Sequence, residues 1–494
     1  MSELSASRVK NLALTGVVSL ALSACATIPG ANVAPGSPIT AAEAQQGAQY
    51  HPQFIAEFGG EMSGPQASYV EDIGQGIAVQ SGLANSPTAF DVTLLNSSVN
   101  NAFAVPGGYV YVTRQLVTLM NNEAELAGVL GHEVGHVAAR HSARRQATAQ
   151  RNQLGGLGVA ILSSVLLGDN PLAGQIGQAA MQGSQLLTLS YSRSQEIEAD
   201  NLGVSYLQRA GYDPRAMASL LQSLAAQNSL DAQLQGRDNA TIPAWASTHP
   251  DPASRVQNAL AQAGAGTGIT NRETFLRRID GLIYGDDPEQ GMIEGRDFIH
   301  PELRLRFTAP QGFYMVNGTQ AVSINGDAGR AQLTTGPYNN NLDAYIRSVF
   351  QAIGGDQQQL APSSIQRTTV NGIPAAYGTA RVNNGQQQVD VTVFAYEFSN
   401  NQAFHFQAIT PAGQAGTFNS MYSSMRRIST AEAAQVVPRR IDIITAARSD
   451  TVQTLARRMA YSDAQEARFR VLNGLFGDAQ VVPGRQYKLV VRAN

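Results

Sequence analysis

Two histidines one helical turn apart constrain the fold of this chain more than any other feature. His132 and His136 enclose Glu133 in the pattern His-Glu-x-x-His. An α-helix turns by about 100° per residue, so residues four apart return to nearly the same face and can bind one metal ion together. Asn121 and Asn122 can cap such a helix, and apolar residues recur at helical spacing after them. The pattern therefore predicts a helix that ends near Arg140 and supplies half of a zinc site.

The residues around this pattern indicate a chemistry and a close packing contact. Glu133 follows the first histidine, where its carboxylate can accept a proton from a water that the ion activates, as in zinc hydrolases. Gly128, Gly131 and Gly135 recur near one face of the predicted helix. Because glycine weakens a helix intrinsically, we interpret them as residues that let another element approach closely.

A catalytic zinc ion usually has three protein ligands and an open fourth position, so a third ligand is needed. The metzincin pattern would place it shortly after His136, but Ala139 stands in place of its glycine and Ser142 in place of its histidine. That class is excluded. His141 is one residue out of register, and on a continuing helix it points away from the ion, which favours a polar role over ligation.

A second helix-like stretch supplies the missing half-site. Glu196 and Asp200 are four residues apart and share a face. One of them can therefore bind the ion while the other accepts the N–H of a ligand histidine and fixes its tautomer. Glu198 faces elsewhere on this predicted helix, and we interpret it as a solvated charge.

The two patterns together, His-Glu-x-x-His and then Glu-x-x-Ala-Asp, resemble those of the M48 peptidases, gluzincins of the HtpX, BepA and LoiP types. Residues 101–112 resemble the strand before the active helix in that family, and residues 247–255 resemble its Thr-His-Pro segment. The resemblance covers residues 40 to 262, roughly. It implies a zinc metalloendopeptidase with one Zn²⁺ per chain. The implied ligands are His132, His136 and Glu196, with Asp200 as the partner of a ligand histidine and Glu133 as the general base.

The Thr-His-Pro resemblance leaves two roles open for His249. It can donate to the oxyanion of the tetrahedral intermediate, or it can bind the ion as a fourth ligand and block the water, which would make it a latch. Arg255 follows on a helix predicted to begin near Pro252. We expect Arg255 to form a structural salt bridge rather than to orient a substrate carbonyl.

The N-terminal segment predicts export and a lipid anchor. Arg8 and Lys10 precede an apolar run that is too short to span a membrane but suits a secretory signal. This run ends in Leu-Ser-Ala-Cys, which resembles a bacterial lipobox with Cys25 as the lipidated residue. Cys25 is the only cysteine, so no intrachain disulfide can form. By this resemblance, and with Ala26 following, we expect an outer-membrane anchor that faces the periplasm.

The remaining patterns predict an α+β multidomain chain, since 494 residues exceed what one core usually serves. A signal peptide (1–24) and a tether (25–40) precede a mainly helical zinc protease domain with a small sheet (41–262). One strand is expected over residues 105–112, broken at its start by Pro106, Gly107 and Gly108. The apolar segment 154–167 is too short for a bilayer and is interpreted as a buried helix or a mobile flap. A connector (263–300) leads to an α+β domain with an antiparallel sheet (301–430).

Residues 436–494 read as strand, helix, helix, strand, and their phrases Asp-Thr-Val and Leu-Asn-Gly-Leu resemble a degenerate LysM module. In its family this module binds the N-acetylglucosamine chains of peptidoglycan. Ser449 departs from the usual glycine, which weakens the expectation of glycan binding more than that of the fold.

These features favour a lipid-anchored, zinc-dependent endopeptidase of the bacterial cell envelope. Its expected substrates are misfolded or misassembled envelope proteins. The alternative is a peptidoglycan-binding adaptor or chaperone lipoprotein whose zinc site is latched or structural. Glu133 counts against the alternative, because a structural site needs no general base. A net charge of −3 with no basic cluster gives no reason to expect nucleic acid.

Overall fold

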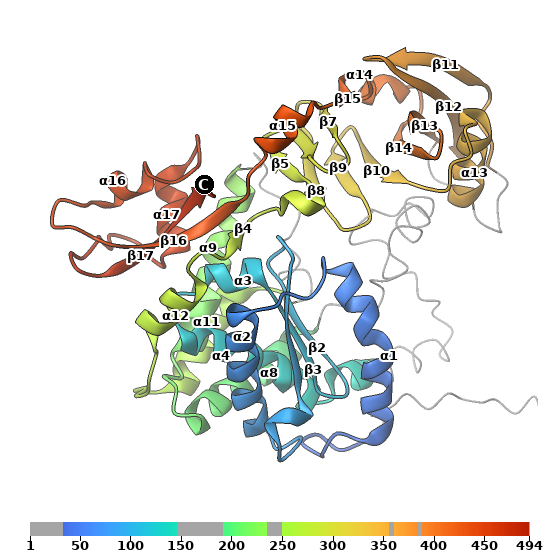
Figure 1. The fold of residues 1–494 in the computed structure, drawn as a ribbon. Helices are drawn as coiled ribbons and strands as arrows, with labels where there is room; N and C mark the ends of the chain where they lie inside the picture. Colours follow the sequence, from blue (N-terminus) through green and yellow to red (C-terminus); the bar gives the residue numbers. More distant parts are fainter. Residues whose placement is uncertain (1–32, 146–190, 235–248, 355–359, 384–387, 494) are drawn as a thin grey trace, which may run out of the picture.

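The computed structural model describes residues 33–145, 191–234, 249–354, 360–383 and 388–493. The predicted signal peptide, Cys25, the first half of the tether (residues 25–32) and the apolar segment 154–167 lie outside these residues. Figure 1 shows that the described part is an α+β multidomain structure, as expected, with a helical N-terminal region, a sheet-rich middle domain and a small C-terminal module. Among the described helices, none has the length and apolar character needed to cross a bilayer.

The N-terminal region builds its helices around a small sheet. The sheet has three strands in the order β1-β3-β2, which are β1 (Asp91–Leu95), β2 (Ala102–Val105) and β3 (Tyr109–Thr113). The helices before the second gap are α1 (Ala41–Glu57), α2 (Pro65–Ala78), α3 (Arg114–Leu119), α4 (Glu123–Ala138), α8 (Arg193–Arg209) and α9 (Ala216–Leu234). The helices after it are α11 (Pro252–Ala263) and α12 (Arg272–Ile279).

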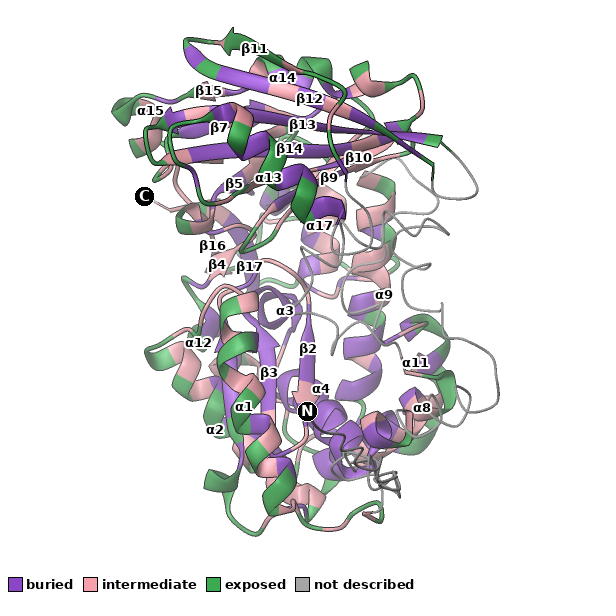
Figure 2. Cartoon of the chain, turned by 90° about the vertical axis from the view of Figure 1, so that its right-hand side faces the viewer, coloured by how far each residue is buried: buried purple, intermediate pink, exposed green. Residues whose placement is uncertain are grey.

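Helix α4 is the centre of this region, and every one of its residues is buried (Figure 2). The predicted cap is confirmed, because the Asn122 side chain accepts a hydrogen bond from the Glu125 backbone N–H. Buried carboxylates fix its first turn: Glu123 accepts hydrogen bonds from the hydroxyls of Tyr69 and Tyr212 at 2.5 and 2.8 Å. The helix that carries the two histidines is therefore held from several sides.

The glycine face of α4 is confirmed as a packing face. A Cβ atom added at Gly135 would lie 3.1 Å from the Ala199 carbonyl oxygen on α8, and one added at Gly131 would lie 3.6 Å from the Cα atom of Gly203. Helices α4 and α8 therefore cross with their backbones close together. Figure 2 shows both near the lower part of the molecule. This close crossing brings the two halves of the predicted metal site within reach of each other.

The break expected at the start of residues 105–112 is present, but it reverses the chain and separates two strands. The segment contains the end of β2 and most of β3, which pair antiparallel with Val105 opposite Tyr109. Gly107 and Gly108 have φ angles of 105° and 91°, a region that disfavours residues with a Cβ. They let the chain reverse where a single strand would have continued. Strand β3 then pairs parallel with β1, which leaves β2 at the edge of the sheet.

The middle domain is dominated by an antiparallel sheet of seven strands in the order β11-β12-β13-β14-β10-β9-β8. These strands are β8 (Tyr314–Asn317), β9 (Val322–Gly326), β10 (Gly329–Thr335), β11 (Ile365–Val370), β12 (Ile373–Asn383), β13 (Gln388–Ser399) and β14 (Gln402–Pro411). A smaller sheet contains β5 (Met292–Glu294), β6 (Asp297–His300), β7 (Leu305–Thr308) and β15 (Arg426–Arg427). The helices are α13 (Leu342–Gly354), α14 (Asn419–Ser424) and α15 (Thr430–Ala434).

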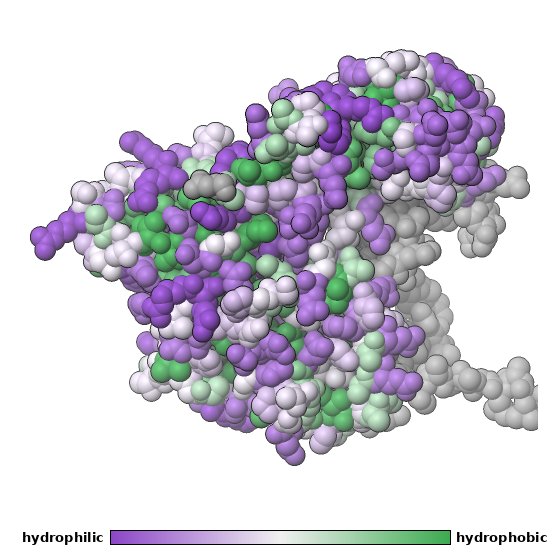
Figure 3. All heavy atoms as spheres, in the orientation of Figure 1, coloured by the Kyte–Doolittle hydropathy of each residue, from purple (hydrophilic) through white to green (hydrophobic). Residues whose placement is uncertain are grey.

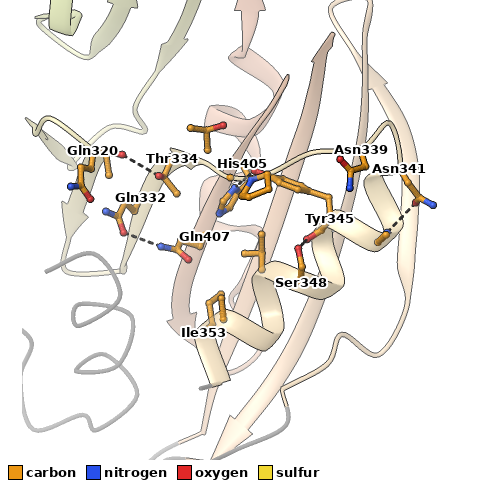
Figure 4. Close-up of a pocket in the computed structure, with 17 residues that line it drawn as sticks. Gln320, Gln332, Thr334, Asn339, Asn341, Tyr345, Ser348, Ile353, His405 and Gln407 are labelled. Atoms are coloured by element: carbon orange, nitrogen blue, oxygen red, sulfur yellow. Dashed lines mark hydrogen bonds between the residues drawn. The ribbon is translucent and has the colours of Figure 1, made fainter. Parts of the chain in front are cut away.

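A cavity of about 660 Å³ lies between α13 and the strands β10 and β14 of this sheet. Figure 4 shows Tyr345 from α13 meeting His405 from β14 in its wall, where the Tyr345 hydroxyl lies 2.8 Å from His405 Nδ1. Gln407 donates to Gln332 across the two neighbouring strands at 2.9 Å. Apart from His405, the residues that line the cavity are neither acidic nor basic, since none of them is Asp, Glu, Lys or Arg. None of them comes from α4 or α8.

The C-terminal module has the predicted order of strand, helix, helix and strand. Its elements are β16 (Arg439–Thr445), α16 (Val452–Ala456), α17 (Gln465–Leu472) and β17 (Gln486–Arg492), and β4 (Ile283–Tyr284) extends its sheet. On the face of the molecule seen in Figure 3, hydrophobic residues gather over this module. Its buried Ile441, Phe469 and Leu489 belong to the same hydrophobic cluster as Leu116 and Leu126 of the N-terminal region. The module therefore packs on that region as part of one core.

Candidate metal centre

Four buried side chains from three elements converge on one point. His132 and His136 come from α4, Glu196 comes from the first turn of α8, and His249 lies just before α11. Each offers one ligand atom, and these atoms lie within 4.8 Å of one another. All four side chains are at most 2% exposed. The structure thus brings together the three residues implied as ligands and adds His249 to them.

The spacing of these atoms fits a zinc ion. Nitrogen and oxygen ligands 2.0–2.1 Å from a tetrahedral ion lie about 3.3 Å from one another. His132 Nε2 lies 3.0 Å from His136 Nε2 and 3.3 Å from His249 Nδ1. Glu196 Oε1 lies 3.3 Å from His136 Nε2 and 3.2 Å from His249 Nδ1. Four buried lone-pair donors at tetrahedral spacing, one of them a carboxylate, match the donor set that zinc prefers.

Asp200 and Arg255 hold the ligands from behind. Asp200 Oδ1 lies 2.9 Å from His132 Nδ1, so it can accept the N–H of this imidazole and leave Nε2 for the ion. Arg255 is 1% exposed and donates to both oxygens of Asp200 at 2.6 and 2.7 Å, and also to Glu196. The expected structural salt bridge of Arg255 is confirmed. Burial alone would raise the pKa of Asp200, but hydrogen bonds from Arg255 and His132 hold it below its ordinary value.

The charge of Glu196 is stabilised in the same way. Burial raises the pKa of this carboxyl group, but the neighbouring His249 and His136 outweigh that effect and hold the pKa well below its usual range. Glu196 is therefore ionised and available as an anionic ligand. The pKa of His136 is lowered chiefly by burial, which favours the neutral imidazole that a metal requires.

Glu133 lies beside the ligand cluster, and one of its carboxylate oxygens can still accept a hydrogen bond. Its side chain is 1% exposed, and among the described residues its Oε1 has no hydrogen-bond partner. His249 Nε2 lies 3.5 Å from this oxygen. Burial raises the pKa of the Glu133 carboxyl to about 8, and a positive charge in the adjacent cluster favours the carboxylate. A buried acceptor of this kind suits a general base.

The end of helix α4 decides the contacts of two residues near the centre. Helix α4 ends at Ala138, and Arg140 takes a left-handed conformation with φ of 54°, so His141 does not continue the helix. The chain turns back, and His141 Nδ1 comes within 2.8 Å of His136 Nδ1. A polar role for His141 is confirmed. The interpretation of Glu198 as only a solvated charge is wrong, because its Oε2 lies 3.1 Å from His141 Nε2.

Sequence reasoning missed Tyr191. Its ring stacks on that of His136 with centroids 3.8 Å apart and an interplanar angle of 20°. Its hydroxyl lies 3.2 Å from the Ser142 hydroxyl. Tyr191 stands directly before the capping residue Ser192 of α8, and this position beside a predicted helix start was its only signal in the sequence. His136, Arg140 and Tyr191 line a cavity of about 10 Å³, which has room for roughly one water molecule.

The comparison with known proteins agrees with this geometry. Residues 65–263 match the model of peptidase family M48. The beta-barrel assembly-enhancing protease of Yersinia pestis is 37% identical over 198 residues, which cover 40% of this chain and 38% of the relative. The protein of the same name from Escherichia coli (strain K12) is 30% identical over 246 residues, covering 48% of this chain and 47% of the relative.

A eukaryotic protein is also similar. The mitochondrial metalloendopeptidase OMA1 of Schizosaccharomyces pombe is 29% identical over 209 residues, covering 42% of this chain and 56% of the relative. This chain therefore spans between a third and three fifths of the length of these relatives. The matched segment includes α4, α8 and α11, the elements that carry the metal ligands and Arg255. Residues 65–263 therefore match peptidase family M48 over the segment that contains the four residues of the possible metal site.

Proposed function

We propose that this protein is a zinc-dependent endopeptidase of the bacterial cell envelope that cleaves misfolded or misassembled envelope proteins. The observation that carries the proposal is the combination of a tetrahedral donor set with a buried, unpaired carboxylate oxygen on Glu133. The names of the bacterial relatives, beta-barrel assembly-enhancing proteases, support an envelope role. In this proposal His132, His136 and Glu196 hold the ion.

The described side chains supply the rest of the chemistry. Zinc bound there would act as a Lewis acid that polarises the scissile carbonyl and activates the attacking water. Glu133 accepts the proton of that water and delivers it to the leaving amine. Asp200 keeps His132 oriented, and Arg255 keeps Asp200 and Glu196 ionised in a site without bulk water. The edge strand β2 offers unpaired backbone groups to an extended substrate.

We propose further that His249 is a latch rather than an oxyanion donor. Its Nδ1 lies at ligand spacing from both His132 Nε2 and Glu196 Oε1, and its Nε2 faces Glu133. A histidine in this place occupies the position that the attacking water needs. Cleavage then requires His249 to leave the cluster.

The location and the C-terminal module belong to the same proposal. The lipobox-like segment supports a lipid on Cys25 and an outer-membrane anchor facing the periplasm. The order of strand, helix, helix and strand supports a LysM-like module at residues 436–494. Radiolabelled palmitate incorporation into the full chain, lost in Cys25→Ser, tests the anchor. An unlabelled wild-type protein would exclude it.

The central experiment measures bound metal and cleavage of casein for the protein lacking residues 1–25. One zinc per chain and activity that Glu133→Gln abolishes while zinc stays bound would establish the peptidase. His249→Ala should raise cleavage several-fold if His249 is a latch, because it opens the water position. A fall in activity in His249→Ala with an unchanged KM would instead assign the oxyanion role. Absence of zinc from the wild type would overturn the proposal.

The second candidate is a peptidoglycan-binding adaptor or chaperone with a closed zinc site. The four-ligand arrangement favours it, because structural zinc sites have all four positions filled by protein. Co-sedimentation with purified peptidoglycan tests the adaptor role. Zinc without cleavage in wild type, Glu133→Gln and His249→Ala, together with co-sedimentation, would establish this candidate in place of the first.

A further inference from the structure

The two metal histidines of α4 are held by different partners. His132 Nδ1 meets a carboxylate directly, Asp200 Oδ1, at 2.9 Å. His136 Nδ1 instead meets a second imidazole, that of His141, at 2.8 Å. The far nitrogen of His141, Nε2, lies 3.1 Å from Glu198 Oε2. A chain of polar contacts therefore runs from His136 through a buried ring to a carboxylate on α8.

The order of protons along this chain follows from the donors and acceptors. A carboxylate only accepts, and a neutral imidazole carries a single N–H. Glu198 therefore places the proton of His141 on Nε2, which leaves the lone pair of His141 on Nδ1. The proton between the two Nδ1 atoms must then belong to His136. In that tautomer the Nε2 lone pair of His136 points to the ligand cluster, 3.0 Å from His132 Nε2.

We propose that His141 and Glu198 form a relay that positions His136, fixing the tautomer and the ring orientation in which its Nε2 binds the metal. The inference rests on the proposed zinc site and extends it to two residues outside the ligand set. Both act through His136, so they are positioning residues and do not touch the substrate. The stacking of Tyr191 on His136 restrains the same ring from its face.

The buried negative charges explain why the partner of His136 is an imidazole ring, whereas the partner of His132 is a carboxylate. Glu133, Glu196 and Asp200 are already buried together, with at most 1% exposure each. Another buried carboxylate would carry a large desolvation cost. In the relay the side chain of Glu198 stays 42% exposed, and Arg144 donates to it at 3.0 Å. Glu198 orients His136 through His141, which is fully buried. Orientation is gained without a fourth buried negative charge.

Zinc affinity of the full chain tests the relay by competition with a chromogenic chelator, with zinc alone as the probe. Losing such a partner of a ligand histidine typically weakens metal binding about 10–100-fold. We expect Glu198→Ala to raise the zinc Kd by about tenfold. Glu198→Gln should restore most of it, because the amide oxygen can accept the same N–H. Glu71→Gln, on the exposed face of α2, is the matched control and should leave the Kd unchanged.

A second pair of variants tests the ring itself. His141→Asn keeps an acceptor near the position of Nδ1, whereas His141→Phe fills the space without one. We expect His141→Phe to weaken zinc binding by about 10–100-fold and His141→Asn to retain most of the affinity. In the cobalt-substituted protein the visible absorption bands should shift in His141→Phe and in Glu198→Ala. They should stay at the wild-type position in Glu71→Gln.

The outcomes separate this inference from the proposed function. A wild type that binds no zinc contradicts the peptidase itself. A wild type that binds zinc, with a Kd that Glu198→Ala changes less than twofold and cobalt bands that do not move, contradicts only the relay. Equal weakening by Glu198→Ala and Glu198→Gln would show that charge, and not hydrogen-bond acceptance, is what matters, and would also overturn it.

Discussion

Arg255 compensates two buried negative charges at once. It donates to both oxygens of Asp200 and to Glu196, and all three side chains are at most 1% exposed. Removing one partner of a buried ion pair typically costs about 3–5 kcal/mol, because the remaining charge stays buried without compensation. Zinc would replace part of the missing positive charge. The effect of Arg255 should therefore depend on the metal.

We predict that Arg255→Met lowers the free energy of unfolding of the zinc-free protein by about 3–5 kcal/mol, and by clearly less with excess zinc. Urea unfolding with and without zinc measures the difference. The control is Arg367→Met, which breaks an exposed pair with Asp343 at 3.0 Å and should cost below about 1 kcal/mol in both conditions. A loss in Arg255→Met that is the same with and without zinc would contradict this account.

The residues of this centre differ in how far the sequence could predict them. His132, His136, Glu196 and Asp200 could be found because the helical period places residues four apart on one face. The contact of His141 could not be found, because it depends on the left-handed Arg140, where the helix stops. The sequence predicts that the helix ends near Arg140, but no residue type there indicates the left-handed turn. The same turn places the buried ring of His141 next to Glu198.

His405 gives the middle domain a stability that depends on pH. It is 4% exposed, and burial lowers its pKa to about 4, against an ordinary value near 6.5. Between these values the unfolded chain binds a proton that the folded chain excludes. Stability is therefore full above about pH 6.5 and falls as the pH decreases toward 4, by a total of about 3 kcal/mol.

We predict that His405→Asn removes this loss of stability on acidification. Asparagine does not titrate, and it can keep a hydrogen bond to the Tyr345 hydroxyl, which lies 2.8 Å from the histidine. Urea unfolding of the middle-domain transition at several pH values between 7 and 4 measures the slope. If the wild type and His405→Asn lose stability equally over this interval, His405 is not the titrating group.

At the scale of elements, the close crossing of α4 and α8 sets the geometry of the metal centre. The crossing depends on small residues, and a Cβ atom at Gly135 would lie 3.3 Å from Ala199 Cα, a backbone atom that cannot rotate away. Larger side chains there should push the helices apart. His132 and His136 on one helix would then separate from Glu196 on the other.

We predict that Gly135→Val destabilises the protein by about 1–3 kcal/mol and lowers its zinc content, since overpacking forces backbone shifts. Gly76→Ala is the matched control. A Cβ atom at Gly76 on α2 meets nothing within 4 Å, so this change should stabilise the protein by up to about 1 kcal/mol through helix propensity. Thermal unfolding and zinc analysis of both variants test the prediction. If Gly135→Val is destabilised but keeps its full zinc content, the helix crossing does not control the metal geometry, and the prediction is contradicted.

The elements themselves were largely predictable from the sequence, with an instructive exception. Helix α4 carries its own cap and period, and β10, β13 and β14 alternate apolar residues as strands do. The sequence predicts a break at Gly107 and Gly108, but not a reversal of the chain, because glycine in a strand pattern can mark either a bulge or a turn. The antiparallel pairing of β2 with β3, which places Ala104 opposite Val110, shows that the chain turns there.

At the scale of the whole molecule, the C-terminal module is joined to the N-terminal region by more than apolar contact. Lys488 of β17 is fully buried, and its Nζ donates to the carbonyl oxygens of Thr118 and Met120, at the end of α3, at 2.8 and 2.6 Å. A lysine is ordinarily a surface residue, so this contact could not be predicted from the sequence. Only the packed structure places the amino group of Lys488 just before the cap of α4.

The contact of Lys488 with the end of α3 predicts that the C-terminal module and the N-terminal region fold as one unit. Lys488→Met leaves the α3 carbonyl oxygens buried without a donor, which should cost about 3 kcal/mol and reduce zinc content, because α4 begins at Glu123 directly after them. Arg485→Met, at an exposed position of the same module, is the control and should change neither. A chain ending at residue 435 should lose its cooperative thermal transition and its zinc. A truncated chain that keeps both would show that the module is an independent attachment, and hydrogen exchange would then find β17 opening separately from α4.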